Sequence, residues 1–148
     1  MKIPANVPAI VGDTVLRVAL GIMFIAHSVV LKYFTFTLAG TAQYFASIGL
    51  PASLAYVVFA AEAVGGALLV LGLYTRWVAL ALVPVLLGAM WVHAGNGWVF
   101  DAPNGGWEYP LFLIVISVVV ALQARVPAAR PLAAGTDRTL RAASRGSE

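Results

Sequence analysis

The sequence predicts an all-α integral membrane protein, a four-helix bundle with a short interfacial helix between the first and second spans. Two observations predict this fold class. Of the 148 residues, 61% are hydrophobic and only 10% are charged, whereas soluble domains average roughly 25% charged residues. The apolar residues also gather in four runs, and a helix needs roughly 20 such residues to cross a bilayer. A water-soluble domain of this length could not bury so much apolar surface.

The first predicted span and the segment after it differ in polarity. The apolar run at 14–33 is long enough to cross the bilayer, and Asp13 or Thr14 is expected to cap its N-terminus. The segment 34–51 is too short to span and carries polar side chains beside apolar ones. We therefore expect it to form an amphipathic helix at the membrane interface.

Three further spans complete the membrane domain, which we place at residues 14–123. Segment 1–13 precedes it, and an Arg/Pro/Ala-rich tail at 124–148 follows it, with the composition of a disordered segment. The later spans are predicted at 53–73, 77–93 and 108–123.

The distribution of Lys and Arg predicts the orientation of the spans. In a four-span bundle, Arg17, Arg76 and the arginines of the tail lie on one side, with Lys32 on the other. Basic residues concentrate on the cytoplasmic side of membrane proteins. Both termini are therefore expected in the cytoplasm, and Lys32 in the outer half of the bundle.

One carboxylate, Glu62, lies near the middle of the second apolar run. A charged group at that depth costs at least about 2.5 kcal/mol, so it should face protein or water and have a partner. Ala61 and Gly65 form a pair of small residues four positions apart, and Gly66 follows directly. Small residues of this kind let a neighbouring helix backbone approach closely.

The other polar groups of the bundle are expected in its outer half. His27, Lys32, His93 and Glu108 all fall there, and the two histidines are the expected neighbours of Glu62. Arg17 is a poor partner, because it lies roughly 10 Å nearer the cytoplasm at the helical rise per residue.

These residues allow three interpretations, and the first two stay open. Glu62 could be a polar contact that fixes helix register. Alternatively, the residues could line an outer cavity in which histidine and lysine hold an anion or a quinone oxygen and Glu62 or Glu108 moves protons. A metal site made of His27, Glu62 and His93 has no close-spaced ligand pair to support it, and no metal is expected.

Several reaction classes are excluded or lack their motifs. The chain contains no cysteine, which excludes thiolate nucleophiles, thiolate metal sites and disulfide relays. It also has no glycine-rich phosphate loop, no G-x-S-x-G elbow and no H-E-x-x-H pair.

Short segments spread over residues 16–122 resemble the DoxX family of membrane proteins in their order and spacing. They are Leu16-Arg17-Val18-Ala19-Leu20-Gly21 followed by Lys32, Phe45-Ala46-Ser47-Ile48-Gly49-Leu50-Pro51, Glu62 with Gly65-Gly66, Gly72-Leu73-Tyr74-Thr75-Arg76, His93, and Gly106-Trp107-Glu108-Tyr109.

The resemblance implies a four-helix domain of the bacterial inner membrane. The related DoxD subunit belongs to a thiosulfate:quinone oxidoreductase, and other relatives are linked to membrane redox and oxidative-stress complexes. We therefore expect a subunit associated with redox chemistry that binds a quinone or a small anion in an outer-half polar cavity. The residues expected to be catalytic are Glu62, His27 and His93, and those expected to bind the cofactor are Arg17, Lys32 and Glu108.

Quinone is the expected cofactor, and the expected partners are the lipid bilayer, redox proteins of the membrane or of solution, and further copies of the chain, with no nucleic acid. Whether the subunit is itself an oxidoreductase of the thiosulfate:quinone type stays open. The alternatives are a non-catalytic scaffold that anchors redox partners, and a module that binds or transports a small molecule.

Overall fold

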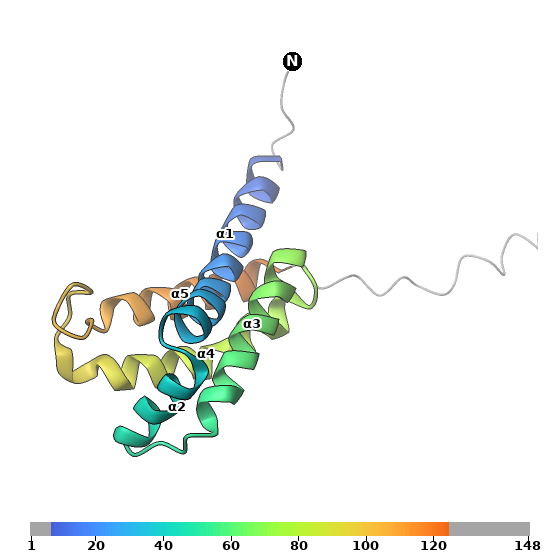
Figure 1. Cartoon of the computed structure of the whole chain (residues 1–148). Coiled ribbons are helices and arrows are strands. Elements are labelled where there is room, and N and C mark those ends of the chain that lie inside the picture. Colours follow the sequence, from blue (N-terminus) through green and yellow to red (C-terminus); the bar gives the residue numbers. More distant parts are fainter. Residues whose placement is uncertain (1–6, 125–148) are drawn as a thin grey trace, which may run out of the picture.

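A computed structural model describes residues 7–124, and all regular structure in that part of the chain is helical (Figure 1). This confirms the predicted all-α class. The predicted tail and the first six residues lie outside the described part. The elements in chain order are α1 (Val7–Ile25), the π-helix η1 (Ala26–Thr35), α2 (Leu38–Ser47), α3 (Leu54–Leu71), α4 (Thr75–His93), the short 3-10 helix η2 (Ala94–Asn96) and α5 (Glu108–Gln123).

Three helical segments are long and apolar enough to cross a membrane. They cover Ile10–Thr35, Leu54–Leu71 and Thr75–Asn96, with 26, 18 and 22 residues. The helix α5 is also apolar, but it has only 16 residues. Large apolar side chains are exposed on all of these helices, Val64, Leu71 and Phe112 among them. Such a surface is suited to lipid, and the chain is a membrane protein whose helices contact the bilayer.

The helices α1 and α3 approach each other closely through glycine. A Cβ atom added to Gly66 would lie 2.7 Å from the carbonyl oxygen of Gly21, and one added to Gly21 would lie 2.7 Å from that of Gly66. A Cβ on Gly65 would instead meet the side chain of Leu82 in α4 at 2.9 Å. The prediction that these glycines admit neighbouring helices is therefore confirmed, with Gly66 facing α1 and Gly65 facing α4.

A second pair of helices, α4 and α5, packs against the first, and the axes of the two pairs run in different directions (Figure 1). The core lies where the pairs meet. It is built from side chains of α1, α3, α4 and α5, among them Leu20, Phe24, Leu69, Leu82, Leu86, Leu113 and Val120.

The predicted start of the first helix is wrong. The helix α1 begins at Val7, so Asp13 and Thr14 lie inside it, and neither caps it. The Thr14 hydroxyl donates to the carbonyl of Ile10 at 2.9 Å, as a residue within a helix can. The helix can start earlier because Pro8 falls in the first turn, where a missing N–H costs nothing.

The connections around α2 and α3 follow their sequence signals. Thr37 caps α2 by accepting a hydrogen bond from the Gly40 N–H at 3.0 Å. The helix α3 ends at Gly72, which has a φ of 74°. Such a left-handed residue is the usual end of an α-helix, and the Leu73 N–H closes the turn on the carbonyl of Leu68 at 2.9 Å. This tight turn leads directly into α4, as predicted.

Candidate functional site

The central feature of the site is an ion pair between η1 and α3. The Lys32 ammonium lies 2.5 Å from a carboxylate oxygen of Glu62, and the two side chains are only 17% and 8% exposed. A buried carboxylate needs a partner, and Glu62 has one. The prediction that Glu62 has a partner is confirmed. The prediction that this partner is a histidine was wrong. The partner is Lys32 rather than an imidazole.

The π-helix η1 explains why the lysine reaches Glu62. The Phe36 N–H donates to the carbonyl of Leu31 at 2.8 Å, five residues back. In an α-helix, residues five apart point about 140° away from each other. In a π-helix, the repeat of its hydrogen bonds brings residues five apart onto one face. His27 and Lys32 are five residues apart and both lie in η1, so both can face the neighbouring helices.

His27 lies beside the ion pair in a defined tautomer. Its Nδ1 is 2.8 Å from the carbonyl oxygen of Met23 and donates to it. The Nε2 atom of a neutral imidazole then carries the lone pair. The His27 ring stacks on the Tyr109 ring of α5, with centroids 5.8 Å apart, and it is close enough to interact electrostatically with Glu62.

Tyr109 is a site residue that the sequence interpretation missed. Its hydroxyl is buried and has no hydrogen-bond partner within residues 7–124. A buried polar group left without a partner costs about 1–3 kcal/mol, so it needs an explanation. Its sequence signals were its place in the Gly106-Trp107-Glu108-Tyr109 segment of the family resemblance and its position at the start of the fourth span, where aromatic residues commonly lie at the membrane interface. We refer to Lys32, Glu62, His27 and Tyr109 as the buried polar cluster.

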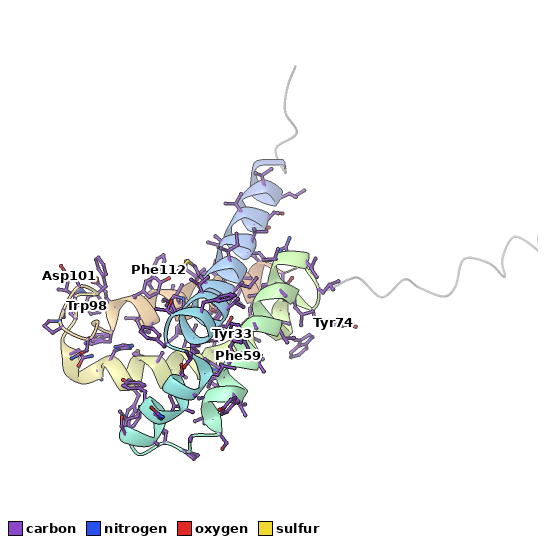
Figure 2. The ribbon with its side chains drawn as sticks, in the orientation of Figure 1. Tyr33, Phe59, Tyr74, Trp98, Asp101 and Phe112 are labelled. Carbon is purple, nitrogen blue, oxygen red and sulfur yellow. The ribbon has the colours of Figure 1, made fainter. Side chains whose placement is uncertain are left out.

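Further aromatic side chains lie on the helices that carry this cluster. The Tyr33 ring of η1 stacks on Phe59 of α3 with centroids 6.2 Å apart (Figure 2). On the other side, the Tyr109 ring lines an open groove of about 470 Å³ along the start of α5. Trp98 and Phe112 also line this groove (Figure 2). The groove is mainly apolar and is not lined by Lys32 or Glu62, so it is not the polar cavity expected around the carboxylate.

The structure places His93 and Glu108 in a different environment. The Nδ1 atom of His93 donates to the carbonyl oxygens of Asn104 and Gly105 at 3.0 and 3.1 Å. Glu108 accepts from the Phe100 N–H at 2.9 Å. Both residues therefore hold the loop between α4 and α5.

His93, the last residue of α4, does not join His27 and Glu62 in a metal site. In the part of the chain that the structure describes, no three His, Asp or Glu side chains are grouped to hold a metal ion. Glu108, in contrast, stays close to Tyr109, because both line the apolar groove of α5.

Arg17 lies at the other end of the α1–α3 pair. Its Nη1 donates to the carbonyls of Leu69 and Val70, the second at 2.9 Å. These carbonyls belong to the last turn of α3, where regular helical donors run out. Arg17 therefore caps this helix end together with the Gly72 N–H, which donates to the Leu69 carbonyl at 3.1 Å. Fifteen residues of helix separate Arg17 from Lys32, which corresponds to roughly 20 Å. The structure therefore does not bring Arg17 into the buried polar cluster.

Comparison with known proteins assigns the family. The DoxX family profile matches residues 12–95, which contain Lys32 and Glu62. The chain is also 38% identical over 113 residues to a Bacillus subtilis (strain 168) protein named "Putative oxidoreductase CatD", a match that covers 76% of this chain and 78% of the relative. No solved structure matches the chain significantly. The match of the profile to more than half of the chain, together with this relative, shows that the chain belongs to the DoxX family.

Proposed function

We propose that this chain is a membrane subunit that takes part in redox chemistry by binding a quinone at the buried polar cluster. The observation that carries the proposal is the Lys32–Glu62 ion pair inside apolar helices, together with the unpartnered hydroxyl of Tyr109, whose ring stacks on His27. The name of the Bacillus subtilis relative, an oxidoreductase, supports the redox assignment.

The proposal includes a membrane arrangement. The three long apolar segments and α5 cross the bacterial inner membrane as a four-helix bundle, with α2 at the outer interface and both termini in the cytoplasm. The support for this orientation is the position of Arg17 and Arg76 at one end of the helices, because basic residues favour the cytoplasmic side. In this orientation Lys32 and Tyr109 lie in the outer half.

A neutral quinone fits the cluster better than a small anion. Lys32 is already neutralised by Glu62 at 2.5 Å, so an anion would have to displace the carboxylate or share the lysine with it. Either change brings an extra negative charge into a poorly solvated site. A quinone carbonyl needs only a hydrogen-bond donor, and the Tyr109 hydroxyl is a donor without an acceptor.

Each residue of the cluster has a role in the proposal. The Tyr109 hydroxyl and the remaining Lys32 N–H groups would donate to the carbonyl oxygens of the quinone. Glu62 and the Nε2 atom of His27 can hold and release protons beside them. A bound quinone supplies two-electron, two-proton redox chemistry. The apolar groove beside Tyr109, of about 470 Å³, would accept the ring or the tail from the lipid side.

The proposal is tested by titrating the purified full chain in lipid nanodiscs with a short-chain quinone and following tryptophan fluorescence. Tyr109→Phe removes only the donor, so we expect about tenfold weaker binding without loss of folding stability. Tyr56→Phe is the matched control, because it removes a hydroxyl from an exposed tyrosine of α3. Equal affinity in the wild type and Tyr109→Phe, or no saturable binding at all, would overturn the proposal.

A second candidate function, a non-catalytic scaffold for redox partners, is favoured by a different aspect of the same contact. Lys32 and Glu62 satisfy each other directly, as two residues that fix helix register would. The uncharged double variant Lys32→Met/Glu62→Leu separates the two functions. A scaffold keeps its co-purifying partners in this variant. A quinone site loses binding, since two of its four polar side chains are gone.

A further inference from the structure

We propose that the opposite end of the molecule binds the headgroup of an anionic phospholipid. A groove of about 720 Å³ lies there between α1, the turn from α3 to α4, and the end of α5. It is separate from the buried polar cluster, because its Arg17 is roughly 20 Å of helix away from Lys32. The inference therefore does not depend on quinone binding.

The charged residues of the groove are complementary to a phosphate group. Arg17, Arg76 and Asp13 line it, which gives the lining a net charge of +1. The two contacts of Arg17 with α3 both use Nη1, and they fix the guanidinium in place. The Nε and Nη2 atoms carry three further N–H donors, and this planar fork matches the oxygens of a phosphate. Arg17 is thus preorganised, and Arg76 adds a second cation.

The remaining walls of the groove suit an acyl chain and the membrane interface. Ile10, Leu73 and Val120 supply apolar surface beside the arginines. Tyr74 and Trp77 are 77% and 70% exposed, and Tyr74 projects outward at this end (Figure 2). Exposed Tyr and Trp residues at helix ends are typical of the headgroup level of a bilayer. A free phosphate ion could use only the arginines, whereas a phospholipid contacts both kinds of wall.

The net charge also indicates the class of lipid. A zwitterionic headgroup carries its own ammonium beside the phosphate, and the two arginines would repel this ammonium more than Asp13 attracts it, because the lining has a net positive charge. An anionic headgroup such as that of phosphatidylglycerol has no such cation. The arrangement therefore favours anionic over zwitterionic phospholipids.

The test measures lipid binding to the full chain in neutral detergent by native mass spectrometry. The probes are phosphatidylglycerol, phosphatidylcholine and inorganic phosphate. We expect saturable binding of phosphatidylglycerol, about tenfold weaker binding of phosphatidylcholine, and no competition from millimolar phosphate. Arg76→Gln should weaken phosphatidylglycerol binding about tenfold, the effect of losing one charge-assisted hydrogen bond. Arg76 is exposed, so this variant is expected to fold.

The control variant is Arg138→Gln, which removes the same charge from the tail. Retained binding in this variant, together with loss in Arg76→Gln, supports the groove. Equal weakening by the two variants would show a general effect of charge and would overturn the proposal. Equal binding of the two lipids, or displacement of phosphatidylglycerol by inorganic phosphate, would overturn it as well, the latter because it identifies a site for free anions.

Discussion

Two cations of one continuous helix, Arg17 in α1 and Lys32 in η1, contact the same neighbour, α3, in different ways. Arg17 donates to backbone carbonyls at the end of α3, whereas Lys32 pairs with the side chain of Glu62. A carbonyl of the backbone can neither take up a proton nor rotate away. A carboxylate can do both. The contact of Arg17 is therefore fixed, whereas a proton or a rotation of the Glu62 side chain can open the contact of Lys32.

The largest effect is expected from breaking the ion pair on one side. Glu62→Leu leaves the Lys32 ammonium without a partner in a poorly solvated site, and we expect it to lower the free energy of unfolding by about 3 kcal/mol. The measurement is the unfolding of the purified chain in mixed micelles as the fraction of SDS increases.

The control for this prediction is the double variant Lys32→Met/Glu62→Leu. Removing both charges leaves no unpaired ion, so most of the lost stability should return. If the double variant is as unstable as Glu62→Leu, the cost comes from packing around position 62 rather than from the unpaired charge.

A smaller loss is expected at the fixed contact. Arg17→Met keeps an apolar stem of similar length but removes the donors to the carbonyls of Leu69 and Val70. Hydrogen bonds from a charged donor contribute about 1.5–3 kcal/mol, so we expect unfolding to become easier by about 2 kcal/mol. Amide hydrogen exchange should also accelerate at the end of α3. Unchanged exchange there would show that Arg17 does not cap the helix.

The glycine contact between the two cations offers a test of the shared interface. Gly66→Ala places a Cβ atom 2.7 Å from the backbone oxygen of Gly21, and we expect a loss of about 1.5 kcal/mol from overpacking. Gly88→Ala is the matched control, since a Cβ there meets nothing within 4 Å. That variant should be neutral or slightly stabilising, because alanine is the better helix former. Equal losses in both variants would contradict close packing at Gly66.

The smallest effect is expected at a contact whose backbone carbonyls have a second side-chain donor. His93→Ala removes the donor to Asn104 and Gly105, but the Asn96 side chain donates to the same two carbonyls. We expect a loss of about 0.5 kcal/mol in the free energy of unfolding, near the average for a polar contact in a membrane protein. A loss as large as that of Arg17→Met would show that Asn96 does not compensate for the lost donor.

Hydrophobic pattern and turn residues were enough to predict the all-helical class and the positions of most helices. The predicted fourth span, 108–123, coincides with α5, and the turn at Gly72 and the packing role of Gly66 are observed as expected. These features depend on local composition and on small residues, which the sequence displays directly. The early start of α1 could not be predicted from Asp13 and Thr14, because side chains that can cap a helix are also tolerated inside one.

The partner of Glu62 could not be predicted, because it depends on the type of helix. On an ordinary α-helix, His27 and Lys32 point in different directions, and only one of them can face α3. Over a segment of ten residues, the spacing of the apolar side chains does not distinguish a π-helix from an α-helix. The position of His93 was missed for another reason. The position of His93 in the sequence places it at the outer end of its helix. It does not reveal that the loop between α4 and α5 supplies the carbonyls that bind its side chain.

The π-helix has a consequence for relatives of different length. His27 and Lys32 face α3 and α5 at a spacing of five residues because η1 has the wider turn. An ordinary α-helix brings residues four apart onto one face. A homologous chain with one residue deleted between the histidine and the lysine could therefore present the same two side chains from an α-helix. Chain length and helix type compensate for each other here, so sequence alignments that place a gap in this segment are compatible with an intact site.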